Sequence, residues 1–232
     1  ISLEFFSNFE AVNMIFLKPR PIGFMQQIIF LIEKEIRLEW RQKYAFNGLL
    51  LYVGATVFIC YLSFHEIIDV PVWNALFWII QLFAGVNAIA KSFLQESRGR
   101  TLYYYVIADP RAIILSKIIY NFLLMMLLSA FNLLFYSFLI GNPIQDMPLF
   151  ICSMILGSMG LSSVLTMVSA IASRAGQSAA LMPILSFPVL LPLLMTTIKL
   201  SKNSIDGLNW SVSQSLVIIL LALNVLVAAM GF

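Results

Sequence analysis

Charged residues are scarce in this sequence. Asp, Glu, Lys and Arg make up 11% of its 232 residues, and hydrophobic residues make up 61%. Soluble globular domains have roughly 25% charged and roughly 45–50% apolar residues. Gly/Ser-rich linkers, low-complexity runs and blocks of like charge are also missing from the sequence. This composition predicts an integral membrane protein without a soluble appendage.

Residues that carry out chemistry are also few. The chain has one histidine, and its two cysteines, Cys60 and Cys152, lie in apolar stretches without CxxC spacing, so we expect them to pack in the core. Neither an HExxH motif nor a pair of carboxylates within an apolar stretch occurs. We therefore predict that the protein is not an enzyme and has no metal site.

Two further absences bear on partners. The sequence contains no G-x-x-x-x-G-K-[ST] phosphate loop, so any work driven by ATP requires a separate subunit. The net charge of +3 is too small to indicate a nucleic-acid partner.

Long apolar runs dominate the remainder of the chain. A helix needs about 20 mostly apolar residues to cross the hydrocarbon core of a bilayer. Six runs of about this length can be found, and they predict an all-α fold of six transmembrane helices within one domain, residues 47–232. The predicted spans are 47–64, 72–93, 118–140, 147–172, 178–198 and 212–232.

The centres of these six spans contain no ionisable side chain. Buried carboxylates or histidines usually mark a proton or ion path through a membrane protein. Their absence argues against an ion-coupled pump.

Positive charge predicts the orientation of the spans. If six spans alternate, all Lys and Arg residues except Lys199 and Lys202 fall on one side of the membrane. Short cytoplasmic loops are enriched in Lys and Arg, so we expect both termini to be cytoplasmic in a multi-pass protein.

An amphipathic segment, residues 25–46, precedes the first span. It combines Glu33–Arg37 and Glu39–Lys43 pairs at i,i+4 spacing with an apolar stripe, which predicts a helix lying in the membrane interface against lipid. A helix packed on a partner protein is the alternative. Residues 1–24 show no clear periodicity, and we interpret them as an N-terminal extension, with Met25 as the natural start. The stripe consists of Ile28, Ile32, Ile36, Trp40 and Tyr44.

Several polar and aromatic residues lie where spans are expected to meet the outer surface. His65 follows the first span and is followed by Glu66 and Asp69. A lone histidine there is usually an interfacial polar residue, although a haem ligand is a weaker alternative. Trp73 and Trp210 fit the aromatic belt at the outer boundary.

The fourth predicted span contains small residues at helical spacing, which allow close approach of another helix. The pattern predicts helix packing, either within one chain or between two copies of it. The residues are Gly157, Ser158, Ser162 and Thr166.

The fifth predicted span contains three prolines, Pro183, Pro188 and Pro192. Each proline removes a backbone donor and leaves one carbonyl without its helical partner. In lipid, such a backbone is tolerated where protein or a cavity satisfies it. We therefore expect a kinked or interrupted helix facing the bundle interior and lining a cavity, with a merely kinked structural helix as the alternative.

A polar connector separates the second and third spans. It is longer than a simple turn requires, and Asp109 with Pro110 is typical of the start of a helix. Its charges and aromatic residues predict a cytoplasmic docking surface for another protein. The candidate residues are Glu96, Arg98, Gly99, Arg100, Asp109 and Pro110.

Three segments together resemble a known family. They are EKEIRLEWRQKYAFNG before the first span, the connector with Glu96, Gly99, Leu102 and Pro110, and SRAGQSAALMPILSFPVLLPLL, where a basic turn runs into the proline-rich span. In this order they resemble ABC-exporter permeases, most closely the CcmB family, the haem-exporter B subunits of cytochrome c maturation. The resemblance covers residues 25–232.

The resemblance implies a six-helix permease of a bacterial inner membrane that forms a homodimer. It implies a CcmA-like cytoplasmic ATPase bound through the connector, and partners similar to the haem-handling proteins CcmC, CcmD and CcmE. Haem would be the transported or handled ligand, and ATP would be hydrolysed by the partner to release the haem-loaded chaperone. Two alternatives stay open, a permease exporting a glycolipid, polysaccharide or drug, and a membrane scaffold that only recruits partners.

Overall fold

The computed structural model describes residues 23–41, 43–64, 69–94, 109–174, 181–230 of the chain. Within these ranges the protein is all-helical, as the sequence predicts, and contains no strand. Six of the helices are long and apolar enough to cross a membrane, which confirms the six predicted spans. The helices are α2 (Phe24–Arg41), α3 (Lys43–Ser63), α4 (Val70–Leu94), α6 (Pro110–Ile140), α7 (Met147–Arg174), α8 (Leu181–Ile205) and α9 (Trp210–Met230).

Several helices extend beyond the predicted spans. Helix α6 begins at Pro110, where the sequence predicts the start of a helix, and so lengthens the span predicted from residue 118, because Asp109 caps it and Pro110 fits its first turn. The helix therefore includes Lys117, which the predicted span left out. Helix α8 continues past residue 198 to Ile205 and includes Lys199 and Lys202. Hydropathy locates the apolar part of each helix, whereas caps determine where the helix ends.

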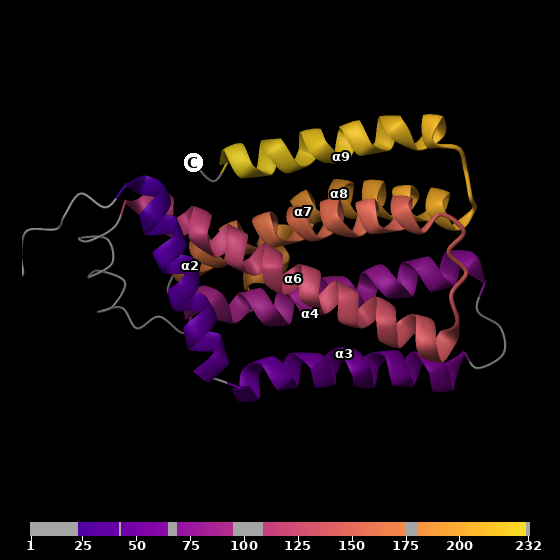
Figure 1. The fold of residues 1–232 in the computed structure, drawn as a ribbon, viewed down its shortest axis with the longest axis horizontal. Helices are drawn as coiled ribbons and strands as arrows, with labels where there is room; N and C mark the ends of the chain where they lie inside the picture. Colours follow the sequence, from indigo (N-terminus) through magenta and orange to yellow (C-terminus); the bar gives the residue numbers. More distant parts are fainter. Residues whose placement is uncertain (1–22, 42, 65–68, 95–108, 175–180, 231–232) are drawn as a thin grey trace, which may run out of the picture.

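The helices form a bundle with one crosswise element. In Figure 1 the six long helices run roughly side by side, whereas α2 lies across one end of the bundle, next to the start of α6. The amphipathic segment forms a helix of its own, but its predicted end at residue 46 is wrong, because α2 ends at Arg41 and both Lys43 and Tyr44 belong to α3. Its outward face carries exposed Met25, Ile29 and Phe30, which suits contact with lipid at the membrane interface.

Helix α7 is the centre of the bundle. It packs against α4, α6, α8 and α9, and most of its span is buried within the protein, unlike the more exposed α3 and α9. Small residues make this position feasible because they let neighbouring backbones approach closely. Gly157 faces the Trp78 ring and Thr197, while Gly160 faces Leu193 and Asn224.

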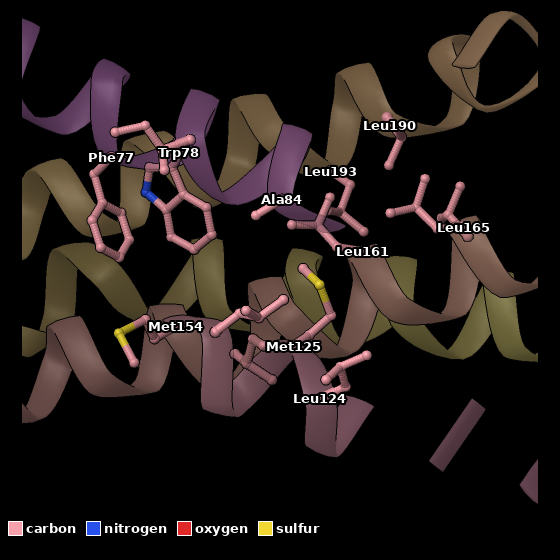
Figure 2. Close-up of a cluster of buried hydrophobic side chains, with 14 of the residues drawn as sticks. Phe77, Trp78, Ala84, Leu124, Met125, Met154, Leu161, Leu165, Leu190 and Leu193 are labelled. Carbon is pink, nitrogen blue, oxygen red and sulfur yellow. The ribbon is translucent and has the colours of Figure 1, made fainter. Parts of the chain in front are cut away.

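Large aromatic and aliphatic side chains fill the space around α7. Trp78 and Phe77 of α4 belong to the same buried cluster as Leu161 of α7 and Leu193 of α8 (Figure 2). Towards one end of this cluster, Trp73 stacks on Phe77, with ring centroids 5.9 Å apart and nearly parallel planes. The core is therefore continuous through three central helices.

The predicted place of Trp73 in an aromatic belt is wrong. Its side chain is buried, and its Nε1–H donates to the carbonyl oxygen of Gly141 at 3.0 Å. A protein partner for the indole N–H makes burial favourable. Trp210, in contrast, is exposed at the start of α9, as expected for a belt residue.

The glycines of α7 and α3 offer a test of the packing. Gly157→Ala would place a methyl carbon 2.6 Å from Trp78 Cη2 and 2.8 Å from Thr197 Cγ2. We expect this overpacking to destabilise the fold by about 1–3 kcal/mol. Gly54→Ala in α3 is the matched control, because its nearest neighbour, Phe135, is 3.9 Å away. Thermal unfolding of the purified variants in detergent measures the difference, and equal melting temperatures would contradict the packing.

Candidate functional site

The candidate coupling residues are only partly described by the structure. Glu96, Arg98, Gly99 and Arg100 lie outside the described residues, as does His65. Asp109 and Pro110 are described, and they form the start of α6. The connector can therefore be followed from the point where it joins the bundle.

Asp109 links the connector to two helices. Its carboxylate accepts a hydrogen bond from the backbone N–H of Arg111 at 2.9 Å and so caps α6. Its own backbone N–H donates to Oε1 of Gln27 in α2 at 3.2 Å. The end of the connector is thus joined to the crosswise helix as well as to the span that follows it.

An apolar contact continues from this junction. Ile28 and Leu31 of α2 are buried against Ala112 and Ile113 of α6. Part of the stripe that the sequence assigns to lipid therefore packs on the protein's own third span. The partner-protein alternative is not needed to explain the buried face of α2, since α6 covers it.

Beyond the apolar contact lies an ion pair. Lys117 Nζ is 3.2 Å from Glu35 Oε1, and the Lys117 side chain is 2% exposed and that of Glu35 14%. Lys34 Nζ also lies 3.2 Å from the same carboxylate oxygen. Removing a buried ammonium group from water is costly unless it is paired. The pair therefore favours one relative position of α2 and α6.

The contacts of α2 with α6 advance in the same direction along both helices. Gln27 meets Asp109, Glu35 meets Lys117, and Glu39 and Tyr120 line the same pocket. The two helices therefore run in the same sense along their contact, which spans about three turns of each. This contact has an apolar centre between polar groups, so a displacement of α2 would act on the first half of α6.

The four small residues of α7 lie inside the bundle. Ser158, Ser162 and Thr166 are fully buried. Ser158 Oγ lies 3.2 Å from Ser129 Oγ of α6, and Thr166 Oγ1 accepts from Asn121 Nδ2 at 2.8 Å. Together with Gly157 they pack against helices of the same chain. A dimer contact would have to use another surface.

Five buried carboxamides join the helices of the bundle, a feature that sequence reasoning missed. Each donates from its amide nitrogen to another helix, at 2.8–3.3 Å. The described part of the chain offers no partner for the side-chain oxygen of four of them, Gln81, Asn121, Asn132 and Asn224. The fifth, Asn74, also accepts from Ser201 Oγ at 2.8 Å. Two carboxamides that are seven or eleven residues apart lie on one face of a helix. Asn74 and Gln81 have the first spacing and Asn121 and Asn132 the second, and these spacings could have indicated the interhelical hydrogen bonds.

The proline-rich helix departs from expectation. Helix α8 is continuous over Pro188 and Pro192, so of the two predicted forms, kinked or interrupted, the structure excludes the interruption. Both prolines are exposed on the outside of the bundle, so they do not face its interior. The opposite face of α8, with Leu190 and Leu193, packs into the core. The Pro183 side chain lies outside the described residues, and its role as a cavity-lining residue stays a prediction.

Comparison with known proteins identifies the family. The sequence matches the family described as CcmB protein over residues 26–232. The chain belongs to the CcmB family. No curated protein and no solved structure matched the chain. CcmB proteins are permease subunits of ABC complexes that serve haem export in cytochrome c maturation, and the six apolar helices agree with a multi-pass membrane protein.

Membership of the CcmB family makes the α2–α6 contact the leading candidate for the site where the permease meets its partners. A CcmB permease works with ABC partners of the same system, such as CcmA. Among the described residues, no three His, Cys, Asp or Glu side chains are grouped to hold a metal ion. The polar groups gathered at the end of the bundle instead connect a surface helix, a connector and a span.

Sequence reasoning missed the Glu35–Lys117 pair. Eighty-two positions separate the partners, and the sequence shows Glu35 only as one charge on an amphipathic helix. A lysine seven residues inside the helix that the sequence predicts to begin at Pro110 was the available signal, but nothing in the sequence indicated that its partner lies in α2.

Breaking this ion pair tests its contribution. Glu35→Gln leaves Lys117 buried without its carboxylate, and we expect a loss of about 3 kcal/mol in unfolding free energy, at the low end for buried pairs because Glu35 is partly exposed. Glu33→Gln is the matched control, because its pair with Arg37 is exposed and should change stability by about 1 kcal/mol or less. Unfolding in detergent measures both variants. Combining Glu35→Gln with Lys117→Met should recover part of the loss. Equal stabilities of Glu35→Gln and Glu33→Gln would show that the buried pair does not stabilise the fold.

Proposed function

We propose that this CcmB-family permease couples ATP hydrolysis by a CcmA-like subunit to movement of its helices, through the connector that ends at Asp109. One observation carries the proposal: Asp109 caps α6 and donates its backbone N–H to Gln27 of α2. A force applied to the connector would therefore reach the crosswise helix and the third span together. Glu96, Arg98, Gly99 and Arg100 would contact the ATPase, and Asp109 and Pro110 would transmit its closure.

The contacts behind Asp109 support a rigid transmission. The apolar cluster and the Glu35–Lys117 pair hold α2 on the first turns of α6, and α6 in turn packs against α7 at the bundle centre. Movement would require the interhelical hydrogen bonds of the carboxamides to rearrange. Their free oxygens on Gln81, Asn121 and Asn132 are acceptors that water or a new donor could use in a second arrangement.

Haem is the ligand that the proposal assigns to the complex, which would include CcmC-, CcmD- and CcmE-like proteins and two copies of the permease. In this role ATP hydrolysis serves release of the haem-loaded chaperone. His65 is retained as a weak candidate for a haem ligand at the outer surface. The export of a glycolipid, polysaccharide or drug is the rival substrate assignment. It predicts normal cytochromes and an altered surface glycan or drug tolerance on gene deletion.

In this role both termini and α2 would lie at the cytoplasmic side of the inner membrane. In Figure 1 the crosswise helix lies at the same end of the bundle as the start of α6 and the end of α9. Twelve of the Lys and Arg residues fall on this side under alternation, which favours the cytoplasm. Helix α2 would then meet the anionic inner surface of the membrane.

Cysteine labelling tests the orientation. In a protein with Cys60 and Cys152 replaced by serine, we introduce Gly23→Cys before α2 or Asn209→Cys between α8 and α9, both exposed. A membrane-impermeant maleimide should label Asn209→Cys in intact spheroplasts and Gly23→Cys only after the membrane is opened. The reverse pattern would overturn the orientation.

Replacing Gln27 tests the coupling. Gln27→Leu removes the acceptor for the Asp109 N–H, and we expect the yield of holo-cytochrome c in a complemented deletion strain to fall by up to about tenfold, the effect of one hydrogen bond on an equilibrium. Gln26→Leu is the matched control, since Gln26 is exposed beside it. Covalent haem staining of membranes measures the yield.

ATPase turnover of the purified complex separates coupling from assembly. Gln27→Leu should retain ATPase activity while cytochrome maturation falls. Equal cytochrome yields in both leucine variants would refute the coupling role of Gln27. Normal holo-cytochrome levels after deletion of the gene would refute the maturation function, and ATPase turnover indifferent to Glu96→Ala would favour the scaffold alternative.

A further inference from the structure

Two lysines of α8 are the exceptions to the charge bias of the sequence. If the spans alternate, Lys199 and Lys202 lie at the end of the bundle opposite α2, the end where α8 finishes and α9 begins (Figure 1). Both side chains are exposed, and neither forms an ion pair within the described part of the chain. The coupling proposed above uses neither residue.

Two contacts place these lysines near the membrane boundary. Asn203 Nδ2 donates to Ser213 Oγ, in the first turn of α9, at 3.1 Å. The carbonyl oxygen of Ser204 accepts from the backbone N–H of Asp146, just before α7, at 2.9 Å. The end of α8 is therefore level with the starts of α7 and α9, where spans meet the interface, and the two lysines lie within about two turns of it.

The lysines continue an apolar face of α8. The residues of this face are spaced by four, four and three positions, which keeps them on one side of a helix. Leu191 is 43% exposed and Met195 58%, and both belong to the part of α8 that is apolar enough to cross a membrane. The face thus presents hydrocarbon first and two positive charges at the boundary. Its residues are Leu191, Met195, Lys199 and Lys202.

Three carboxylates of the described residues lie at the same end of the bundle. Asp146 is occupied as a cap, since its side chain accepts from the backbone N–H of Leu149 at 3.1 Å. Asp69 precedes α4, and Asp206 is exposed just past the end of α8. None of the three forms an ion pair with either lysine among the described residues. On the exposed side of α8 the two lysines outnumber Asp206, so this side favours an anion.

We propose that this face of α8 binds an anionic phospholipid of the phosphatidylglycerol class, from the leaflet opposite α2. Its phosphate lies between Lys199 and Lys202, and one acyl chain lies along Met195 and Leu191. The phosphate oxygens accept hydrogen bonds from the two ammonium groups, which have donors and no acceptor. A lipid meets the face in the order in which α8 presents it, charge at the boundary and hydrocarbon below.

The same charges disfavour other occupants of this face. A zwitterionic phospholipid brings an ammonium or choline group that the lysines repel. A second copy of the chain, related by a two-fold axis along the membrane normal, would place residues of the same depth against each other, so its lysines would meet Lys199 and Lys202. The lipid assignment does not depend on which ligand the permease serves.

Tryptophan fluorescence tests the proposal with the full chain in vesicles of phosphatidylcholine. Met195→Trp places a reporter on the exposed face, and the protein without this change supplies the signal of the native tryptophans. The probes are phosphatidylglycerol and phosphatidylcholine with the same brominated acyl chains, which quench a tryptophan that they touch. We expect the apparent binding constant to be about tenfold higher for phosphatidylglycerol, about threefold from each exposed lysine. Equal binding constants would overturn the proposal.

Two double variants, each combined with Met195→Trp, locate the bound lipid. Lys199→Gln with Lys202→Gln should abolish the preference for phosphatidylglycerol. Arg37→Gln with Arg111→Gln is the matched control, because it removes two exposed positive charges from α2 and the start of α6, at the opposite end of the bundle (Figure 1), and should leave the preference unchanged. A preference that survives without the lysines, or that is lost in both double variants, would overturn the site. Quenching by neither lipid would show that protein, a second copy of the chain included, covers this face instead.

Discussion

Close approach of helices around α7 is the constraint on which the remaining structure depends. In hydrocarbon, apolar side chains gain little by leaving lipid for protein, so spans associate through packing and interhelical hydrogen bonds. Helix α7 meets both requirements, since its glycines admit Trp78 and Leu193 and its hydroxyls bond with Asn121 and Ser129. The carboxamides of α4, α6 and α9 extend these bonds to the helices around it.

Helix α2 is held by different interactions from those of the spans, because it lies across the end of the bundle. Its inner face is held by an apolar cluster and by the buried ammonium group of Lys117 next to Glu35, while its outer face carries exposed Met25 and Ile29. A helix attached both to lipid and to the first turns of a span can pass a displacement between the surface and the bundle. The proposed coupling to an ATPase partner would use this property.

The sequence predicts the spans well because each is decided by composition over about 20 residues. The sequence prediction fails where a residue distant in the chain determines whether a side chain is buried. Trp73 is a belt residue by its position along the chain but is buried because Gly141 offers its carbonyl. Pro188 and Pro192 predict a helix turned to the interior, yet they lie on the exposed side of a continuous α8, where lipid rather than a cavity would surround them.

The sequence alone determined the membrane class, the six spans, the amphipathic helix and the resemblance to CcmB proteins, because hydropathy, charge bias and motif order are local properties. Only the tertiary structure decided that Glu35 meets Lys117 and that Gln27 receives the connector at Asp109. These relations join residues about eighty positions apart. They depend on how α2 crosses the end of the bundle, and no periodicity within a single helix encodes that crossing.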